Sequence, residues 1–122
     1  MGYRSQVVLA FDKALLPKFL DVIARSEDTK RLVFEWRESW DKEFEVTCYG
    51  EQSDNEGHHC IMWDNIKWYP DEDTRAIENF VSENYENARF LRIGEEYDDS
   101  DDYGEFAQCT IEIQRTQSIE FY

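Results

Sequence analysis

The chain has 122 residues, of which 28 are acidic and 13 are basic, so its formal net charge is −15. A chain of this length folds as one domain, residues 1–122, and its aromatic content of 16% can supply a substantial core. The charge argues against direct nucleic-acid binding, because phosphate backbones attract cationic surfaces. Residues 1–61 hold 12 acidic and 8 basic side chains whereas residues 62–122 hold 16 and 5, so the C-terminal half is the more negative.

Hydrophobic periodicity predicts that the N-terminal half begins with a strand and a helix. Residues 3–11 are apolar and β-branched, which is typical of a buried strand. Apolar side chains then recur at helical spacing from Leu15 to Ile23, and Pro17 requires that this helix begins late or irregularly. Residues 26–36 predict a second, shorter helix.

A hairpin is predicted in the middle of the chain. Residues 42–50 alternate apolar and polar side chains, which is the period of a half-buried strand. The polar residues 51–57 form the predicted loop, and residues 58–69 form the returning strand.

The strongest helix pattern covers residues 70–88, with Pro70 and acidic residues at its start. Residues 89–94 and 106–115 predict two more strands on either side of an acidic loop. The whole order predicts an α+β fold, specifically a ferredoxin-like, antiparallel-rich sheet with two main helices packed on one face.

The cysteines are odd in number, namely Cys48, Cys60 and Cys109, and they lack metal-type spacing. We therefore expect three free thiols in a reducing compartment. The apolar run at residues 7–11 is too short for a secretion signal or a membrane span, so we expect a cytoplasmic protein without a membrane partner.

The acidic loop holds seven carboxylates between Glu95 and Glu105. A calcium loop that starts at Asp99 fails, because Tyr103 and Thr110 stand where oxygen ligands are required. We expect neither a resident metal nor a cofactor. A solvated loop, a partner-binding surface and a looser divalent-cation site remain open, the last from Asp98, Asp99, Asp101 and Asp102.

Mimicry of DNA requires a denser row of charge than this loop holds by itself. In extended form it would carry one carboxylate per roughly 5 Å, against about 3.4 Å for one DNA strand. Acids on the 70–88 helix, including Glu78, Glu83 and Glu86, would add a second row if both elements lie on one side. The predicted partner-binding residues are Glu95, Glu96, Asp98, Asp99, Asp101, Asp102 and Glu105 with Asp71, Glu72 and Asp73. If the loop is only solvated or partner-binding, exchange of its four aspartates for asparagine should not unfold the domain.

Two further clusters have both a packing and a functional interpretation. His58 and Cys60 would share a strand face near Cys48, but without paired metal spacing a zinc site is not expected. Aromatic residues occupy both faces of the 63–69 run, so Trp63, Trp68 and Tyr69 either pack under a helix or anchor a protein interface.

Four segments together resemble a family of small acidic proteins from bacteriophage and prophage genomes: MGYRSQV (1–7), WDNIKWY (63–69), RIGEEYDD (92–99) and SIEF (118–121). The family has no assigned activity, so the resemblance brings no catalytic residue. It implies a phage origin and an accessory role in the cytoplasm of a bacterial host.

We therefore expect a phage-encoded protein that binds and inhibits a basic host protein, and that this host protein handles nucleic acid. Binding would occur by DNA mimicry or by plain charge complementarity, and the target would belong to a host-defence system. The alternative is a small-ligand or nucleotide-binding module that uses Arg89 and Arg92. No catalytic motif occurs in the chain, so an enzyme is not expected.

Overall fold

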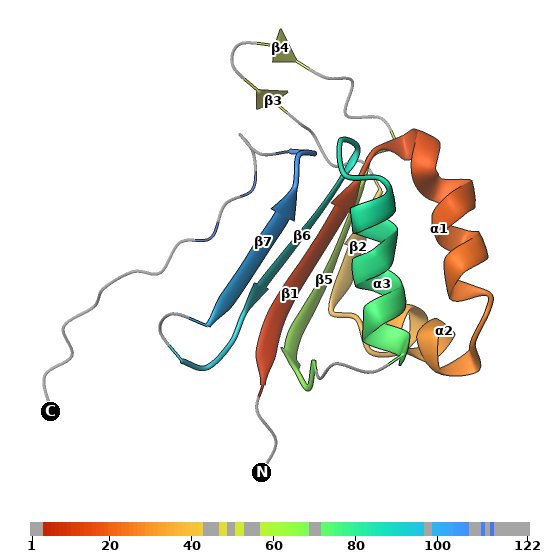
Figure 1. Cartoon of the computed structure of the whole chain (residues 1–122), viewed down its shortest axis with the longest axis vertical. Coiled ribbons are helices and arrows are strands. Elements are labelled where there is room, and N and C mark those ends of the chain that lie inside the picture. The colour runs from red at the N-terminus through yellow and green to blue at the C-terminus, as the bar shows by residue number, and fades with distance from the viewer. Residues whose placement is uncertain are drawn as a thin grey trace, which may run out of the picture.

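A computed structural model describes residues 4–42, 47–48, 51–52, 57–68, 72–96, 99–107, 111 and 113. In this part of the chain a five-stranded antiparallel sheet carries three α-helices on one face (Figure 1). The predicted α+β class is therefore confirmed. None of the described helices combines the length and the apolar character needed to cross a bilayer.

The first strand, β1 (Ser5–Phe11), lies in the middle of the sheet and leads into two short helices. A 3-10 turn at Lys13–Leu15 precedes α1 (Leu16–Ile23), so Pro17 falls in the first turn, where a missing N–H does no harm. The next helix, α2 (Glu27–Phe34), begins where the hydroxyl of Ser26 accepts hydrogen bonds from two backbone N–H groups.

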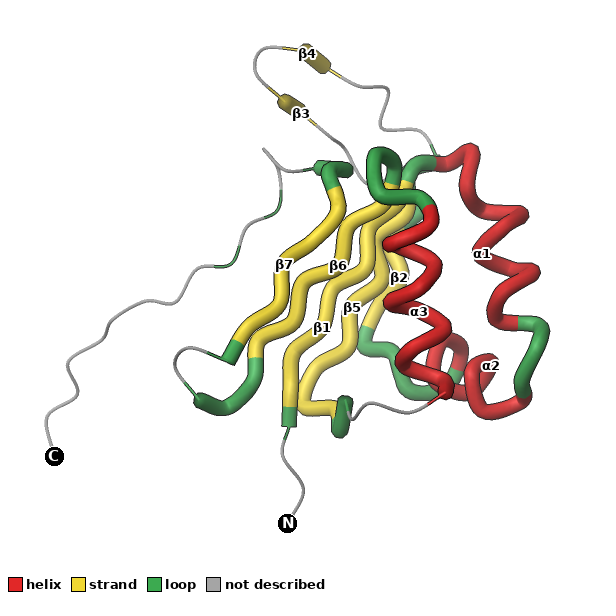
Figure 2. The backbone as a smooth tube through the Cα atoms, viewed as in Figure 1, coloured by secondary structure: helices red, strands yellow, loops and turns green. Residues whose placement is uncertain are grey.

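The sheet order is β2-β5-β1-β6-β7, and Figure 2 shows these strands side by side. The strands other than β1 are β2 (Ser39–Asp41), β5 (His59–Ile66), β6 (Ala88–Ile93) and β7 (Ser100–Gly104). Because β1 and β2 both run antiparallel to β5, they form one split βαβ unit around it. β5, α3 (Glu72–Glu83) and β6 form a second unit around β1. The ferredoxin-like description itself stays a prediction, which this order supports.

The predicted hairpin between residues 42–50 and 58–69 is wrong in its pairing. The strand that joins β5 is Ser39–Asp41, since Trp40 packs against the core and donates its indole N–H to Nδ1 of His59 at 3.0 Å. Thr47–Cys48 (β3) instead pairs with Glu51–Gln52 (β4) in a separate two-stranded ladder. Residues 43–46, 49–50 and 53–56 lie outside the described residues.

The main core lies between the sheet and the helices, and it includes both tryptophans of the predicted aromatic anchor. Trp63 is fully buried and donates its indole N–H to the carbonyl of Leu32 in α2 at 2.7 Å. Trp68 is buried between the rings of Trp63 and Phe90. Neither side chain is available to a partner, so this site prediction is wrong for both, and Tyr69 lies outside the described residues.

Part of the predicted acidic loop is a strand. β7 pairs with β6 along its whole length, from Ile93 opposite Ser100 to Arg89 opposite Gly104. The strand predicted for residues 106–115 is not found in its described part, because residues 106–107 form a turn and residues 111 and 113 are irregular. The arginines of β6 explain why an aspartate-rich segment joins the sheet.

Candidate functional site

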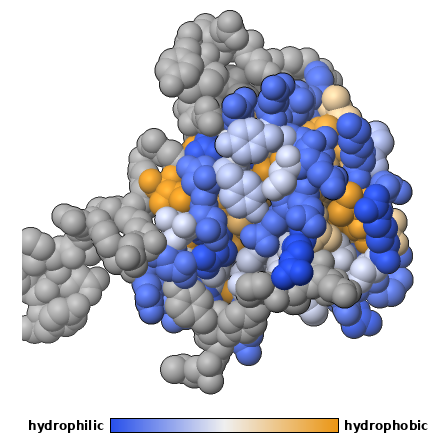
Figure 3. All heavy atoms as spheres, viewed as in Figure 1, coloured by the Kyte–Doolittle hydropathy of each residue, from blue (hydrophilic) through white to orange (hydrophobic). Residues whose placement is uncertain are grey.

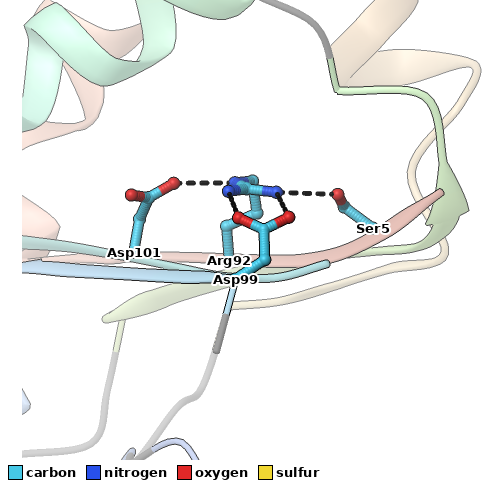
Figure 4. Close-up of polar contacts among 4 residues, drawn as sticks. All are labelled: Ser5, Arg92, Asp99 and Asp101. Atoms are coloured by element: carbon cyan, nitrogen blue, oxygen red, sulfur yellow. Dashed lines mark hydrogen bonds and ion pairs between the residues drawn. The ribbon is translucent and has the colours of Figure 1, made fainter. Parts of the chain in front are cut away.

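Arg92 of β6 is the centre of the polar cluster on the helix-bearing side of β7 (Figure 4). Its Nη2 lies 2.5 Å from Oδ1 of Asp99, and its Nε lies 2.7 Å from Oδ2 of Asp101. Its Nη1 donates a further hydrogen bond to the hydroxyl of Ser5 at 3.1 Å. The hydrogen bond with Asp99, together with that to Asp101, raises the pKa of Arg92, so this guanidinium is permanently charged.

Arg89 forms the equivalent contact on the other face of the sheet. Strand residues three positions apart point to opposite faces, so Arg89 meets Asp102 rather than Asp101. Its Nε and Nη2 donate to the two carboxylate oxygens of Asp102 at 3.1 and 3.0 Å, which is a bidentate pair. Its Nη1 donates to the carbonyls of Ala107, at 2.9 Å, and Ile111. Arg89 therefore holds both β7 and the segment that follows it.

These contacts show that three of the predicted partner-binding residues are already paired within the chain. Asp99, Asp101 and Asp102 are each bonded to an arginine of the same chain, although the side chains of Asp101 and Asp102 remain 45% and 44% exposed. Exchange of the aspartates for asparagine would remove the carboxylates that pair with both arginines among the described residues. That this exchange spares the fold stays a prediction, which these ion pairs argue against.

The remaining predicted acids fall into two groups. Glu95, Glu96 and Glu105 are exposed, and Glu95 accepts a hydrogen bond from the backbone N–H of Arg4 at 2.9 Å. Asp98 and Asp71 lie outside the described residues, and nothing is described of the side chains of Glu72 and Asp73.

Glu78 of α3 and the inward side of β7 come together in one place. Burial raises the pKa of Glu78, and the negative charge of Asp101 raises it further. The hydroxyl of Tyr103 hydrogen bonds to Glu78, and the charges of Arg92 and Arg75 also oppose the rise. Burial likewise raises the pKa of Tyr103, with Glu78 as the next cause. Glu78 of the helix and Asp101 of the strand thus lie on one side, whereas Glu83 lines a groove between α3 and the segment from α1 to α2.

The histidines and Cys60 beside them serve packing. The ring of His59 stacks on Phe11 at 5.0 Å, and burial lowers its pKa. Cys60 is a buried free thiol whose pKa burial raises to about 12, which makes it a poor nucleophile and metal ligand. Among the described residues no three His, Cys, Asp or Glu side chains are placed to hold a metal ion.

The alternative of a small-ligand or nucleotide site built on Arg89 and Arg92 is not supported by the structure. Arg89 is 4% exposed and Arg92 is surrounded by its carboxylate partners, so neither is offered to a small ligand. The sequence itself indicates that these arginines could pair with aspartates, because both lie on a predicted strand immediately before the acidic segment. Only the pairing of β6 with β7 assigns each carboxylate to its arginine.

No protein-family model, curated protein or solved structure matches the chain.

Proposed function

We propose that the protein binds a basic partner protein through an acidic face formed by α3, β7 and the turns that flank β7. The acidic face comprises Glu78, Glu86, Glu95, Glu96, Asp99, Asp101 and Glu105. The observation that carries the proposal is that exposed carboxylates lie at both ends of β7, Glu95 and Glu96 at one end and Glu105 at the other, with the partly exposed Asp101 between them. Figure 3 shows that hydrophilic residues cover much of the described surface on the side in view, with hydrophobic patches between them.

Contacts at the two ends of β7 extend the acidic face. The backbone N–H of Glu105 donates to the carbonyl of Tyr85 at 2.7 Å, which brings Glu105 beside the turn that carries Glu86. At the other end, the N–H of Gly94 donates to the carbonyl of Asp99 at 2.8 Å and closes the turn that carries Glu95 and Glu96.

A partner's lysine or arginine would bind the outward oxygens of Asp101 together with Glu78. A cation placed there offsets the repulsion between these carboxylates, so it would lower the pKa of Glu78. Binding in mildly acidic solution would then release a proton. Such a surface also attracts a basic partner over long distances and speeds association.

The biological setting that we propose is the one implied by the resemblance. A phage-encoded accessory protein in the host cytoplasm would use this face against a host-defence protein that handles nucleic acid. Such proteins carry basic grooves for phosphate backbones, which an acidic surface can occupy.

The test is capture of proteins from a bacterial lysate at low and high salt, with identification by mass spectrometry. Wild-type protein should capture a basic protein at about 0.1 M salt and release it near 1 M, as the Debye length falls from about 10 to about 3 Å. The triple variant Glu95→Gln, Glu96→Gln and Glu105→Gln should lose this capture while its arginine pairs stay intact.

A matched variant controls for total charge. Glu27→Gln, Glu35→Gln and Glu38→Gln remove the same number of carboxylates from exposed positions in or beside α2. This control should keep the captured protein. Equal capture by both triple variants, or capture that does not change with salt, would contradict the proposal.

A further inference from the structure

An open groove of about 490 Å³ lies where the end of β5 meets α2 and the first turn of α3. Its walls include Leu32, Trp36, Ile66 and Thr74. The volume falls in the range of about 300 to 1,000 Å³ that is usual for small-molecule sites. The groove shares none of its lining residues with the acidic face.

The β5 wall of the groove has an irregular backbone. The register between β1 and β5 shifts there, since Ser5 lies opposite Ile66 whereas Val7 lies opposite Trp63. Asn65, within this bulge, has a positive φ of 53°, and Nη1 of Arg4 donates to its carbonyl at 3.3 Å. Bulges of this kind redirect side chains and are frequent beside binding sites.

Two cationic side chains and one carboxylate, Asp64, line the groove in a protein that is otherwise strongly acidic. Arg4 and Lys67 both line it, although the chain as a whole has a net charge of −15. Neither side chain forms a salt bridge with another described residue. Trp36 stands beside them with 56% of its surface exposed, which is unusual for the largest aromatic side chain.

We propose that this groove binds a nucleoside monophosphate. The base would stack on the indole of Trp36, above the apolar side chains of Leu32 and Ile66. The phosphate would lie between Lys67 and Arg4, whose guanidinium can donate two parallel hydrogen bonds to it. Asp64, which also lines the groove, would accept hydrogen bonds from the ribose hydroxyls.

The chemistry favours this ligand over simpler and larger ones. An apolar ligand would leave the two cations unused, and inorganic phosphate would leave Trp36 unused. A triphosphate would place more negative charge in the repulsive field of the whole protein. The site does not depend on the proposed function, because it involves other residues and another type of ligand.

The test is calorimetric titration of the full chain with AMP, GMP, CMP and UMP, and with adenosine and inorganic phosphate alone. At least one nucleotide should bind more tightly than either fragment. Lys67→Gln removes a charged donor and should weaken that binding at least about tenfold. Trp36→Leu should weaken it comparably, by loss of stacking.

Lys18→Gln is the matched control, since Lys18 is an exposed lysine of α1 outside the groove. It should leave the affinity unchanged. Because Trp36 and Lys67 are exposed, their variants should keep the wild-type unfolding midpoint, which thermal unfolding can verify. The proposal is overturned if no nucleotide binds at millimolar concentration, if phosphate alone binds as tightly, or if Lys67→Gln and Lys18→Gln bind alike.

Discussion

Asp101 and Asp102 are neighbours in β7 with the same exposure, but their removal should have different consequences. The side chain of Asp102 is 44% exposed and pairs with Arg89, whose side chain is 5% exposed. Asp101 is 45% exposed and shares Arg92 with Asp99. Asp102→Ala therefore leaves a buried arginine without a carboxylate among the described residues, whereas Asp101→Ala leaves Arg92 with one.

The burial of each arginine and the number of its carboxylate partners determine how much stability each variant loses. Removal of one partner of a buried ion pair costs about 3 to 5 kcal/mol, and the exposure of Asp102 places this case near the lower value, at about 3 kcal/mol. Loss of one of two charged partners at Arg92 should cost about 1 kcal/mol. The difference of about 2 kcal/mol corresponds to about 8 °C in Tm for a domain of this size.

Thermal and urea unfolding followed by circular dichroism measure this difference directly. The double variant Arg89→Met with Asp102→Ala provides the control, because an apolar side chain at the buried position removes the unpaired charge. It should recover much of the stability lost in Asp102→Ala. Equal destabilisation by the two single variants, or no recovery in the double variant, would refute the assignment of these pairs.

Three other predictions concern stability and reactivity. Because the pKa of Glu78 is raised in the folded state, the folded protein binds more protons than the unfolded protein at pH values above 4.5. The free energy of unfolding should therefore fall as the pH rises from 4.5 through the raised pKa. Glu78→Gln should remove this fall, and unfolding midpoints measured between pH 4 and 8 will show whether it does. Cys60, with a pKa raised to about 12, should resist iodoacetamide in the native protein at pH 8 and react after denaturation, as mass spectrometry can determine. Gly104→Ala should destabilise the protein by roughly 3 kcal/mol or more in urea unfolding, since φ is +95° and a Cβ would lie 2.1 Å from the carbonyl oxygen of Ala88; a wild-type midpoint would contradict the close approach of β6 and β7.

Local patterns determined the elements with strong periodicity. The strand at the start of the chain and the helix within residues 70–88 were predicted because burial of one face leaves a regular spacing of apolar residues. The late start of α1 followed from Pro17, whose ring restricts the backbone of its own neighbours. These features depend on residues close together in the chain.

The role of the aromatic residues required the tertiary structure. Trp63 and Trp68 lie in a run with aromatic side chains on both faces, so alternation could not say which face was core. The position of α2, whose Leu32 accepts the indole hydrogen bond of Trp63, decided it. Likewise, Trp40 stood outside the predicted strand, and only its packing against His59 extended the sheet to residue 39.

The acidic segment shows the limit of local reasoning most clearly. Aspartate and glycine are depleted in strands, so the composition of residues 100–104 by itself predicts a loop. Pairing with β6 reverses that preference, because it places Arg92 against Asp99 and Asp101 and Arg89 against Asp102. The groove beside Trp36 also results from tertiary structure. Arg4, Trp36 and Lys67 are distant in sequence, and they come together only where the bulge in β5 approaches α2. Electrostatic attraction acts through space rather than along the chain, so the sequence by itself determined how much charge the protein carries, and the fold decided which of the described charges are paired within the chain.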